Sequence, residues 1–174
     1  MTSELHPDIA HLGFLLGTWR GRGEGSYPTI ESFAYVEELT FQHVGKPFLS
    51  LSQKTKHADT GVPLHAEVGY LRPVGTERVE LVVVSPTGIF ELHEGTISST
   101  RSTGSTGSTG STADAVRLAL SSTQVSTTPT AKTATEVVRT FDVAGDQLSY
   151  VIDMAAVDQP LQHHLAATLN RDAG

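Results

Sequence analysis

The chain has 174 residues, a length that favours a single domain over residues 1–174 with one hydrophobic core. Its formal net charge of −7, with 19 acidic against 12 basic residues, argues against nucleic-acid binding. The lack of cysteine excludes disulfides, thiolate metal ligands, a cysteine nucleophile and CxxCH haem attachment. The start MTSELHPDIA has no signal-peptide pattern and no apolar run is long enough to cross a membrane, so we expect a soluble, cytoplasmic protein without a membrane partner.

The first predicted element is a short helical turn within residues 6–19, with Asp8 as a possible cap and Ile9, Leu12 and Leu15 on one side. The rest of the chain has the segment lengths and the Gly, Pro and Asp turns of β-strands. The expected strands are 19–25, 32–42, 47–57, 64–72, 78–84, 88–96, 116–123, 132–142, 147–156 and 163–170. Since no helix is long enough for a βαβ crossover, the pattern predicts an all-β, ten-stranded antiparallel up-and-down barrel. A two-sheet sandwich also fits this pattern.

One segment interrupts the succession of strands. The run 102-STGSTGSTGST-112 repeats Ser, Thr and Gly, a composition typical of flexible linkers. A domain boundary there would leave too few strands for the C-terminal part to close by itself. We therefore expect a lengthened hairpin loop at about residues 99–113, which costs little extra loop-closure entropy.

Glycines recur at every second position in 17-GTWRGRG-23, with Trp19 between them. Glycine at alternate strand positions clears one face, which permits a tight bend or the close approach of a neighbour. The pattern of Gly17, Trp19, Gly21 and Gly23 predicts barrel closure, with Trp19 as an apolar plug at the closed end.

Motifs of common enzymes are missing from the sequence, which has no GxSxG, HExxH or P-loop pattern. Glu37 and Glu38 are adjacent on an expected strand, so their carboxylates should diverge, and we interpret them as part of an outward, salt-bridging face. The eight histidines show no metal-ligand spacing, although distant strands could still bring some of them together.

Two adjacent histidines, His163 and His164, begin the last expected strand. Neighbouring residues on a strand point to opposite faces, so at most one of the pair faces the interior. Alternation groups His163 with the apolar Leu165, Ala167 and Leu169, and His164 with Ala166 and Thr168. A rule that turns apolar residues inward would choose His163. Small residues such as Ala166 and Thr168 could instead line a cavity, and a bulge could change the alternation, so the residues alone leave the choice between the two histidines open.

The motif GTWRGRG resembles the GxWxGxG signature of the nitrobindin family, also called peroxynitrite isomerases. The resemblance continues through 27-YPTI-30, 35-YVEELTFQHVGKPFL-49, 64-LHAEVGYLRP-73, 129-PTAK-132 and 154-MAAVDQPLQHHLAATL-169. It covers nearly the whole chain apart from the Ser/Thr/Gly repeat. It implies a ten-stranded β-barrel that holds one haem b non-covalently, with His164, in His164-Leu165, as axial ligand to the iron.

The same resemblance places further residues at the haem. Leu64, His65 and Met154 match stretches that line the site, and Lys132 is a candidate partner for a haem propionate. Thr40 and His43 could border the cavity. A cross-strand hydrogen bond is the alternative for His65, and an ordinary solvated side chain is the alternative for Lys132.

The implied function is a ferric haem protein that isomerises peroxynitrite to nitrate and binds nitric oxide at the open sixth iron position. In such a protein the haem supplies the chemistry, while the protein supplies axial ligation, access and water exclusion. The resemblance also suggests a homodimer. Two alternatives remain: a lipocalin-like carrier of a small apolar ligand without haem catalysis, which would not need His164, and a filled barrel that serves as an interaction domain.

Overall fold

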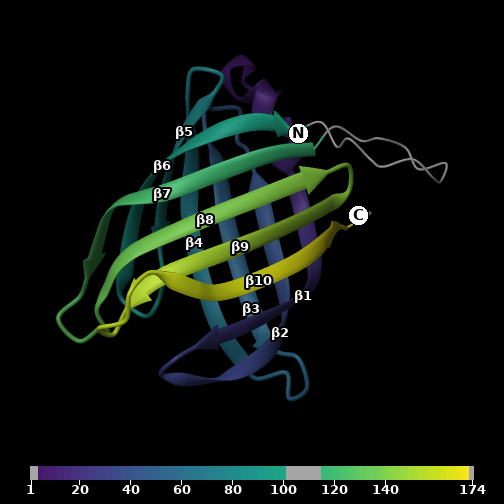
Figure 1. The fold of residues 1–174 in the computed structure, drawn as a ribbon. Helices are drawn as coiled ribbons and strands as arrows, with labels where there is room; N and C mark the ends of the chain where they lie inside the picture. The colour runs from purple at the N-terminus through teal and green to yellow at the C-terminus, as the bar shows by residue number, and fades with distance from the viewer. Residues whose placement is uncertain (1–3, 101–114, 173–174) are drawn as a thin grey trace.

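Ten antiparallel strands form one closed barrel, as shown in Figure 1. The computed structural model describes residues 4–100 and 115–172. A 3-10 helix, η1 (Pro7–Leu15), precedes the strands. The strands are β1 (Gly17–Tyr27), β2 (Ile30–Gln42), β3 (Leu49–His57), β4 (Pro63–Val74), β5 (Arg78–Val84), β6 (Ile89–Thr100), β7 (Ala115–Thr127), β8 (Ala134–Ala144), β9 (Gln147–Ala156) and β10 (Gln162–Arg171).

Each strand pairs with its neighbours in sequence, and β1 pairs with β10 to close the barrel. This confirms the ten-stranded up-and-down barrel and rules out the sandwich. Because the strands alternate in direction, η1 and the β2–β3, β4–β5 and β8–β9 connections share one end, which we call the helix end (Figure 1). The β1–β2, β3–β4, β5–β6, β7–β8 and β9–β10 connections form the opposite end.

The observed strands overlap all ten predicted ones and extend several of them. Strand β6 continues to Thr100 and pairs there with Ala115 of β7, and β7 continues to Thr127. Ser99 and Thr100 therefore belong to a strand, whereas the remainder of the predicted loop, residues 101–113, lies outside the described residues. No helix in the described part of the chain has the length and apolarity that a membrane crossing requires.

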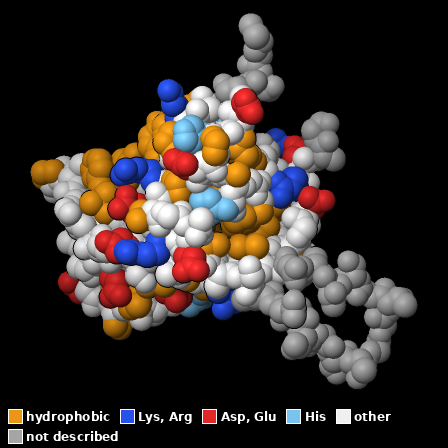
Figure 2. Space-filling model, turned by 90° about the horizontal axis from the view of Figure 1, so that it is seen from above, with side chains coloured by type: hydrophobic (Ala, Val, Ile, Leu, Met, Phe, Trp, Pro, Cys, Tyr) orange, Lys and Arg blue, Asp and Glu red, His pale blue; other side chains and the backbone are white. Residues whose placement is uncertain are grey.

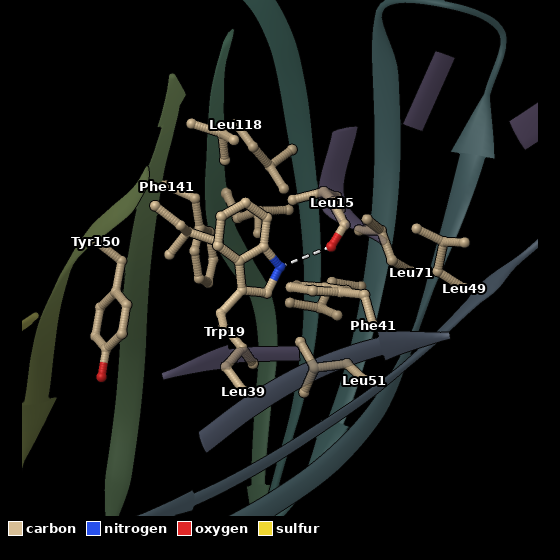
Figure 3. Close-up of a cluster of buried hydrophobic side chains, with 14 of the residues drawn as sticks. Leu15, Trp19, Leu39, Phe41, Leu49, Leu51, Leu71, Leu118, Phe141 and Tyr150 are labelled. Carbon is tan, nitrogen blue, oxygen red and sulfur yellow. Dashed lines mark hydrogen bonds between the residues drawn. The ribbon is translucent and has the colours of Figure 1, made fainter. Parts of the chain in front are cut away.

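Trp19 fills the helix end of the barrel, as its sequence context predicts. Its side chain is fully buried, and its indole Nε1 donates a hydrogen bond of 2.8 Å to the carbonyl of Leu15 at the end of η1 (Figure 3). The Arg171 guanidinium lies over the ring, 4.0 Å from its centroid, and donates to the carbonyl of Phe14. The helix, β1 and β10 are thus joined through one side chain.

The helix buries the side predicted for it, because Ile9, Leu12 and Leu15 are fully enclosed. The predicted cap was wrong. His6 is the N-cap residue, and its Nδ1 accepts a hydrogen bond of 3.2 Å from the backbone N–H of Asp8. An imidazole nitrogen therefore takes the role that sequence preference gives to a carboxylate. In Figure 2, which looks onto the helix end, side chains fill this end without a visible opening.

The alternate glycines of β1 allow close contacts inside the barrel. A Cβ at Gly21 would collide with the carbonyl oxygen of Thr168 and lie 2.8 Å from the Cα of Leu169. A Cβ at Gly23 would overlap the phenol ring of Tyr35. The predicted role of these glycines in close approach between strands is confirmed.

Candidate functional site

His164 is the extra residue of a β-bulge in β10. His163 pairs with Asp153 and Leu165 pairs with Ile152, so His164 has no counterpart on β9. The prediction that a bulge changes the alternation is confirmed, and His163 is the surface residue, with 51% of its side chain exposed and its Nδ1 3.5 Å from Asp153 Oδ1. The prediction that Thr168 lines the interior was wrong. Thr168 is exposed, and the bulge instead places the buried Ala167 and Leu169 on the inner face.

The ring of His164 lies against a second irregularity, on the neighbouring strand β1. The β1–β2 register shifts between Gly25 and Tyr27, so Ser26 leaves the regular ladder. The carbonyl oxygen of Ser26 lies 3.2 Å from Nδ1 of His164. Since a carbonyl only accepts, Nδ1 carries the proton and Nε2 keeps its lone pair. Burial lowers the pKa of His164, which favours the neutral imidazole.

Tyr27, to which sequence reasoning gave no role, holds this corner together. Its ring contacts that of His164 edge-on, with centroids 5.3 Å apart and planes at 72°. Its hydroxyl lies 3.1 Å from the carbonyl of Met154 and accepts a hydrogen bond of 2.9 Å from the N–H of Ala156. β1, β9 and β10 therefore fix the orientation of His164 jointly. We call this end of the barrel the His164 end.

Several predicted residues gather at the His164 end. His65, near the start of β4, lies on the inward side of its strand with the buried Glu67. Met154 of β9 packs against the apolar core. Lys132 lies exposed in the β7–β8 connection at this end. Leu64 is also at this end, but alternation with His65 turns it outward, and it is 43% exposed.

Thr40 and His43 do not belong to this group. Thr40 faces the outside of β2, between the inward Leu39 and Phe41, and its hydroxyl lies 3.2 Å from that of Thr18. His43 is in the β2–β3 connection at the helix end, where its Nδ1 accepts a hydrogen bond from the N–H of Gly45. The prediction that they border the cavity was wrong, because their place in a similar sequence stretch did not specify the face or the end.

A layer of buried polar side chains crosses the interior between the two ends, and its first half centres on Arg139 of β8. The guanidinium donates to both carboxylate oxygens of Glu67, at 2.6 and 2.9 Å, and to Glu91 Oε2, at 2.8 and 3.1 Å. Nε2 of the fully buried His93 lies 2.8 Å from the same Glu91 oxygen. Burial opposes ionisation of Glu67, but Arg139 and His65 outweigh it and lower its pKa to about 2.

The second half of the layer contains a carboxyl group without a direct cation. Glu37 accepts hydrogen bonds from Tyr150 and, at 2.6 Å, from Gln53, and the hydroxyls of Tyr35 and Tyr150 lie 2.8 Å apart. Burial raises the pKa of Glu37 to about 7. The adjacent carboxylates diverge as predicted, and Glu38 pairs outward with Arg20. The outward interpretation was wrong for Glu37, which lies inside the barrel and is 4% exposed.

The chemistry of the residues at the His164 end fits a haem. A neutral imidazole with Nδ1 bonded to a carbonyl has the tautomer that iron ligation through Nε2 requires. Met154 adds an apolar side chain, and Lys132 is a cation at the rim of the same end. Within residues 4–100 and 115–172, no group of three or more His, Asp or Glu side chains is placed to hold a metal ion.

Known proteins resemble this chain over nearly its full length. Residues 8–171 match the family of the THAP4-like, heme-binding beta-barrel domain. Peroxynitrite isomerase 2 of Mycobacterium avium is 50% identical over 171 residues, which cover 98% of this chain and 99% of that protein. Peroxynitrite isomerase of Nocardia farcinica is 51% identical over 168 residues, which cover 97% and 93%. The crystal structure of Rv2717c from M. tuberculosis matches with a TM-score of 0.86 at 46% identity, covering 97% of this chain and 99% of that one. The chain therefore belongs to the THAP4-like haem-binding β-barrel family, the nitrobindin family that its motifs resemble.

Proposed function

We propose that the protein binds one haem b per chain through Nε2 of His164 and isomerises peroxynitrite to nitrate. The observation that carries this proposal is the bulge at His164. It turns a single histidine out of the regular ladder, and the carbonyl of Ser26 fixes that histidine in the tautomer of an iron ligand. The names of the relatives at about half identity support the reaction.

The residues around His164 have distinct roles in this proposal. Ser26 holds the proton on Nδ1 and so keeps Nε2 available. Tyr27 restrains the rotation of the ring. Met154 excludes water from the inner side of the site, and Lys132 offers a positive charge at the rim for a propionate. His65 faces the site from the other side of the barrel.

When bound, ferric haem would supply an iron that can react with peroxynitrite and bind nitric oxide. The conversion of the peroxynitrite anion to nitrate moves one oxygen atom and no proton, so it requires no general acid or base from the protein. Its part is to hold the axial imidazole, to admit a small ligand and to exclude water.

Stopped-flow absorbance tests the activity directly. The haem-loaded protein should accelerate the decay of peroxynitrite in proportion to its concentration, with nitrate as the product. The matched control is haem-loaded protein in which cyanide occupies the iron position that is left open for the substrate. Decay no faster than in the haem-free protein would contradict the proposed reaction and leave a haem or apolar-ligand carrier.

A homodimer is the second part of the proposal, and an apolar block on the outer face supports it. Val68 pairs with Val84 and Val84 with Phe90, while Tyr70 pairs with Val82 and Val82 with Leu92, so the six side chains form two rows across β4, β5 and β6. Five of them are at least 40% exposed, and none carries a charge. The chain is acidic overall, so an uncharged block on its surface fits a partner surface that is also uncharged. A second copy of the chain supplies such a surface in a two-fold contact.

Sedimentation velocity tests the dimer. The wild-type protein should sediment as a dimer at micromolar concentration, and Val82→Lys should shift it to a monomer because it places a charge at the centre of the block. Glu80→Lys, on the same outer face of β5 but outside the block, is the matched control. A monomeric wild-type protein would contradict the proposal.

A further inference from the structure

His65 lies on the far side of the barrel from His164. The strands between them are β1, β2 and β3 in one direction and β9, β8, β7, β6 and β5 in the other, so β4 and β10 are nearly opposite. Both histidines are at the same end, because His65 is near the start of β4 and His164 is near the start of β10. A ligand bound on the inner side of His164 therefore has His65 on its opposite side.

The ring of His65 lies next to a carboxylate. Its Nε2 lies 3.6 Å from Oε2 of Glu67, two residues further along the same face of β4. The side chain of His65 is 36% exposed, whereas that of Glu67 is 4% exposed. The pair thus leads from the His164 end into the buried polar layer.

Arg139 holds the Glu67 carboxylate in place. Its two terminal nitrogens bond the two carboxylate oxygens in parallel, at 2.6 and 2.9 Å, and both side chains are 4% exposed. Such a two-bond pair fixes the plane of the carboxylate as well as its position. Arg139 also bonds Glu91, so one guanidinium faces two carboxylates and the group has an excess of negative charge. This negative charge favours an N–H donor of His65 next to the Glu67 carboxylate.

We propose that Glu67, clamped by Arg139, is a positioning residue that holds His65 with Nε2–H toward Glu67 and with an unprotonated Nδ1 toward the His164 end. There Nδ1 accepts a hydrogen bond from the protonated form of the ligand that binds opposite His164. The positioning itself stands on the contacts of the haem-free chain, while the role toward the ligand rests on the proposed function. His65 then favours peroxynitrous acid over the anion.

The chain contains its own matched control. Glu91 and His93 on β6 repeat the arrangement of Glu67 and His65, with a carboxylate bonded to Arg139 and to a histidine two residues away. Neutralising either glutamate removes one negative charge from beside Arg139. Of these two glutamates, Glu67 is the one whose carboxylate lies next to the His65 ring, so its replacement should change the tautomer of that ring and the replacement of Glu91 should not.

Long-range ¹H–¹⁵N NMR of the haem-free protein at about pH 8 measures the tautomer of each histidine. In the wild type we expect His65 with Nε2–H and unprotonated Nδ1. In Glu67→Gln we expect the opposite tautomer, because Arg139 only donates and draws the amide oxygen to itself, which leaves the amide NH₂ facing Nε2. In Glu91→Gln we expect the wild-type tautomer at His65 and a change at His93.

The wild-type protein alone can overturn the proposal. It does so if Nδ1 of His65 carries a proton, whether the ring is neutral or doubly protonated. The same tautomer in wild type and Glu67→Gln also overturns it. Glu67→Asp, which keeps the charge, should retain the wild-type tautomer if Glu67→Gln does not fold.

The pH profile of peroxynitrite decay by the haem-loaded protein tests the role toward the ligand. The rate constant of the wild type should rise toward acidic pH as the protonated substrate accumulates, and Glu67→Gln should lose this rise. An unchanged profile overturns the role toward the ligand. A wild type that does not bind haem or react contradicts the proposed function instead, while the NMR result still decides the positioning of His65.

Discussion

The two ends of the barrel differ in what their side chains do. At the helix end, Trp19 is buried under η1, bonded to Leu15 and covered by Arg171, and its surroundings are apolar leucines and phenylalanines (Figure 3). At the other end, His164 and Ser26 leave the regular ladder through two register shifts on adjacent strands. The residues that fill the helix end are thus separate from those that define the site.

This difference explains why the GxWxGxG signature and the axial histidine lie far apart along the barrel although both identify the family. Gly21 and Gly23 permit the close packing of β1 against β10 and Tyr35, and Trp19 seals the helix end. The irregular backbone needed to aim His164 inward is restricted to the ends of β1 and β10. Changes at the helix end should therefore cost stability, and changes at the His164 end should cost ligand binding.

Trp19→Ala should have the largest effect on stability. Removal of a fully buried indole, with loss of its hydrogen bond to Leu15, should lower the free energy of unfolding by about 3–5 kcal/mol. Urea denaturation followed by circular dichroism measures this. His164→Ala, at the other end, should change it by about 1 kcal/mol. Equal losses in the two variants would contradict the separation of the two ends.

Gly21→Ala should destabilise the closure of the barrel next most strongly. The added Cβ would collide with backbone atoms of β10, which cannot rotate away, so we expect a loss of roughly 1–3 kcal/mol. Gly13→Ala in η1 is the control, because its nearest neighbour would be a side-chain carbon of Leu5 at 4.0 Å. Thermal unfolding of both variants measures the difference. A Gly21→Ala protein as stable as Gly13→Ala would show that the close approach of β1 and β10 is dispensable.

Glu37 lies in the polar layer between the two ends. Glu37→Gln should change how the free energy of unfolding of the protein depends on pH. Glu37 keeps its proton in the folded protein up to about pH 7, whereas in the unfolded chain it loses it near its ordinary value of 4.5. Its contribution to stability is therefore complete below pH 4.5 and is lost as the pH rises through 7. Denaturation of the wild type at pH 5 and pH 8 should show this fall, of the order of 1–3 kcal/mol, and Glu37→Gln should show less of it.

For Glu67, the expected change of stability with pH has the opposite sign, so this residue serves as an internal comparison. Its pKa of about 2 lies below the ordinary value, so its contribution is complete above pH 4.5 and is lost as the pH falls toward 2. Glu67→Gln should flatten the slope between pH 5 and pH 8 less than Glu37→Gln does, because burial is the main cause that raises the pKa of Glu37 and the charge of Glu67 adds a smaller part. A wild-type protein that becomes more stable between pH 5 and pH 8, with no change in Glu37→Gln, would show that Glu37 is ionised throughout.

Lys132→Ala should have the smallest effect. Lys132 is exposed in a connecting segment, and an exposed ion pair with a propionate contributes about 0–1 kcal/mol. We expect haem affinity to fall by less than about tenfold at low salt and stability to stay unchanged. Titration with hemin at two salt concentrations measures this, with Lys46→Ala at the helix end as the control. A complete loss of haem would show that Lys132 does more than pair with a propionate.

Much of this fold could be predicted from the sequence, because turn residues and alternating burial specify strands locally. All ten strands and the buried face of η1 followed from such patterns. The end and the face of a residue were harder to predict, as Thr40 and His43 show. The end at which a residue lies depends on strand direction, and its face depends on alternation. A matching motif alone specifies neither.

The polar layer was missed although its signal is present in the sequence. Arg139 has the same strand parity as the buried Val137, Phe141 and Val143, and a charge on the apolar parity indicates an interior ionic group. Glu67 and Glu91 follow the same rule on β4 and β6. At His164, by contrast, strict alternation gave the wrong lining residues, since no local pattern shows where a bulge inserts one residue.

The central claim is that His164, and not His163, binds the haem iron. An absorbance titration of the purified protein with hemin tests it most directly, with His164→Ala and His163→Ala compared side by side. We predict a strong Soret band that saturates at one haem per chain in the wild type and in His163→Ala, and that is lost or shifted in His164→Ala. A Soret band that is unchanged in His164→Ala and lost in His163→Ala would contradict the assignment of the bulge residue as the axial ligand.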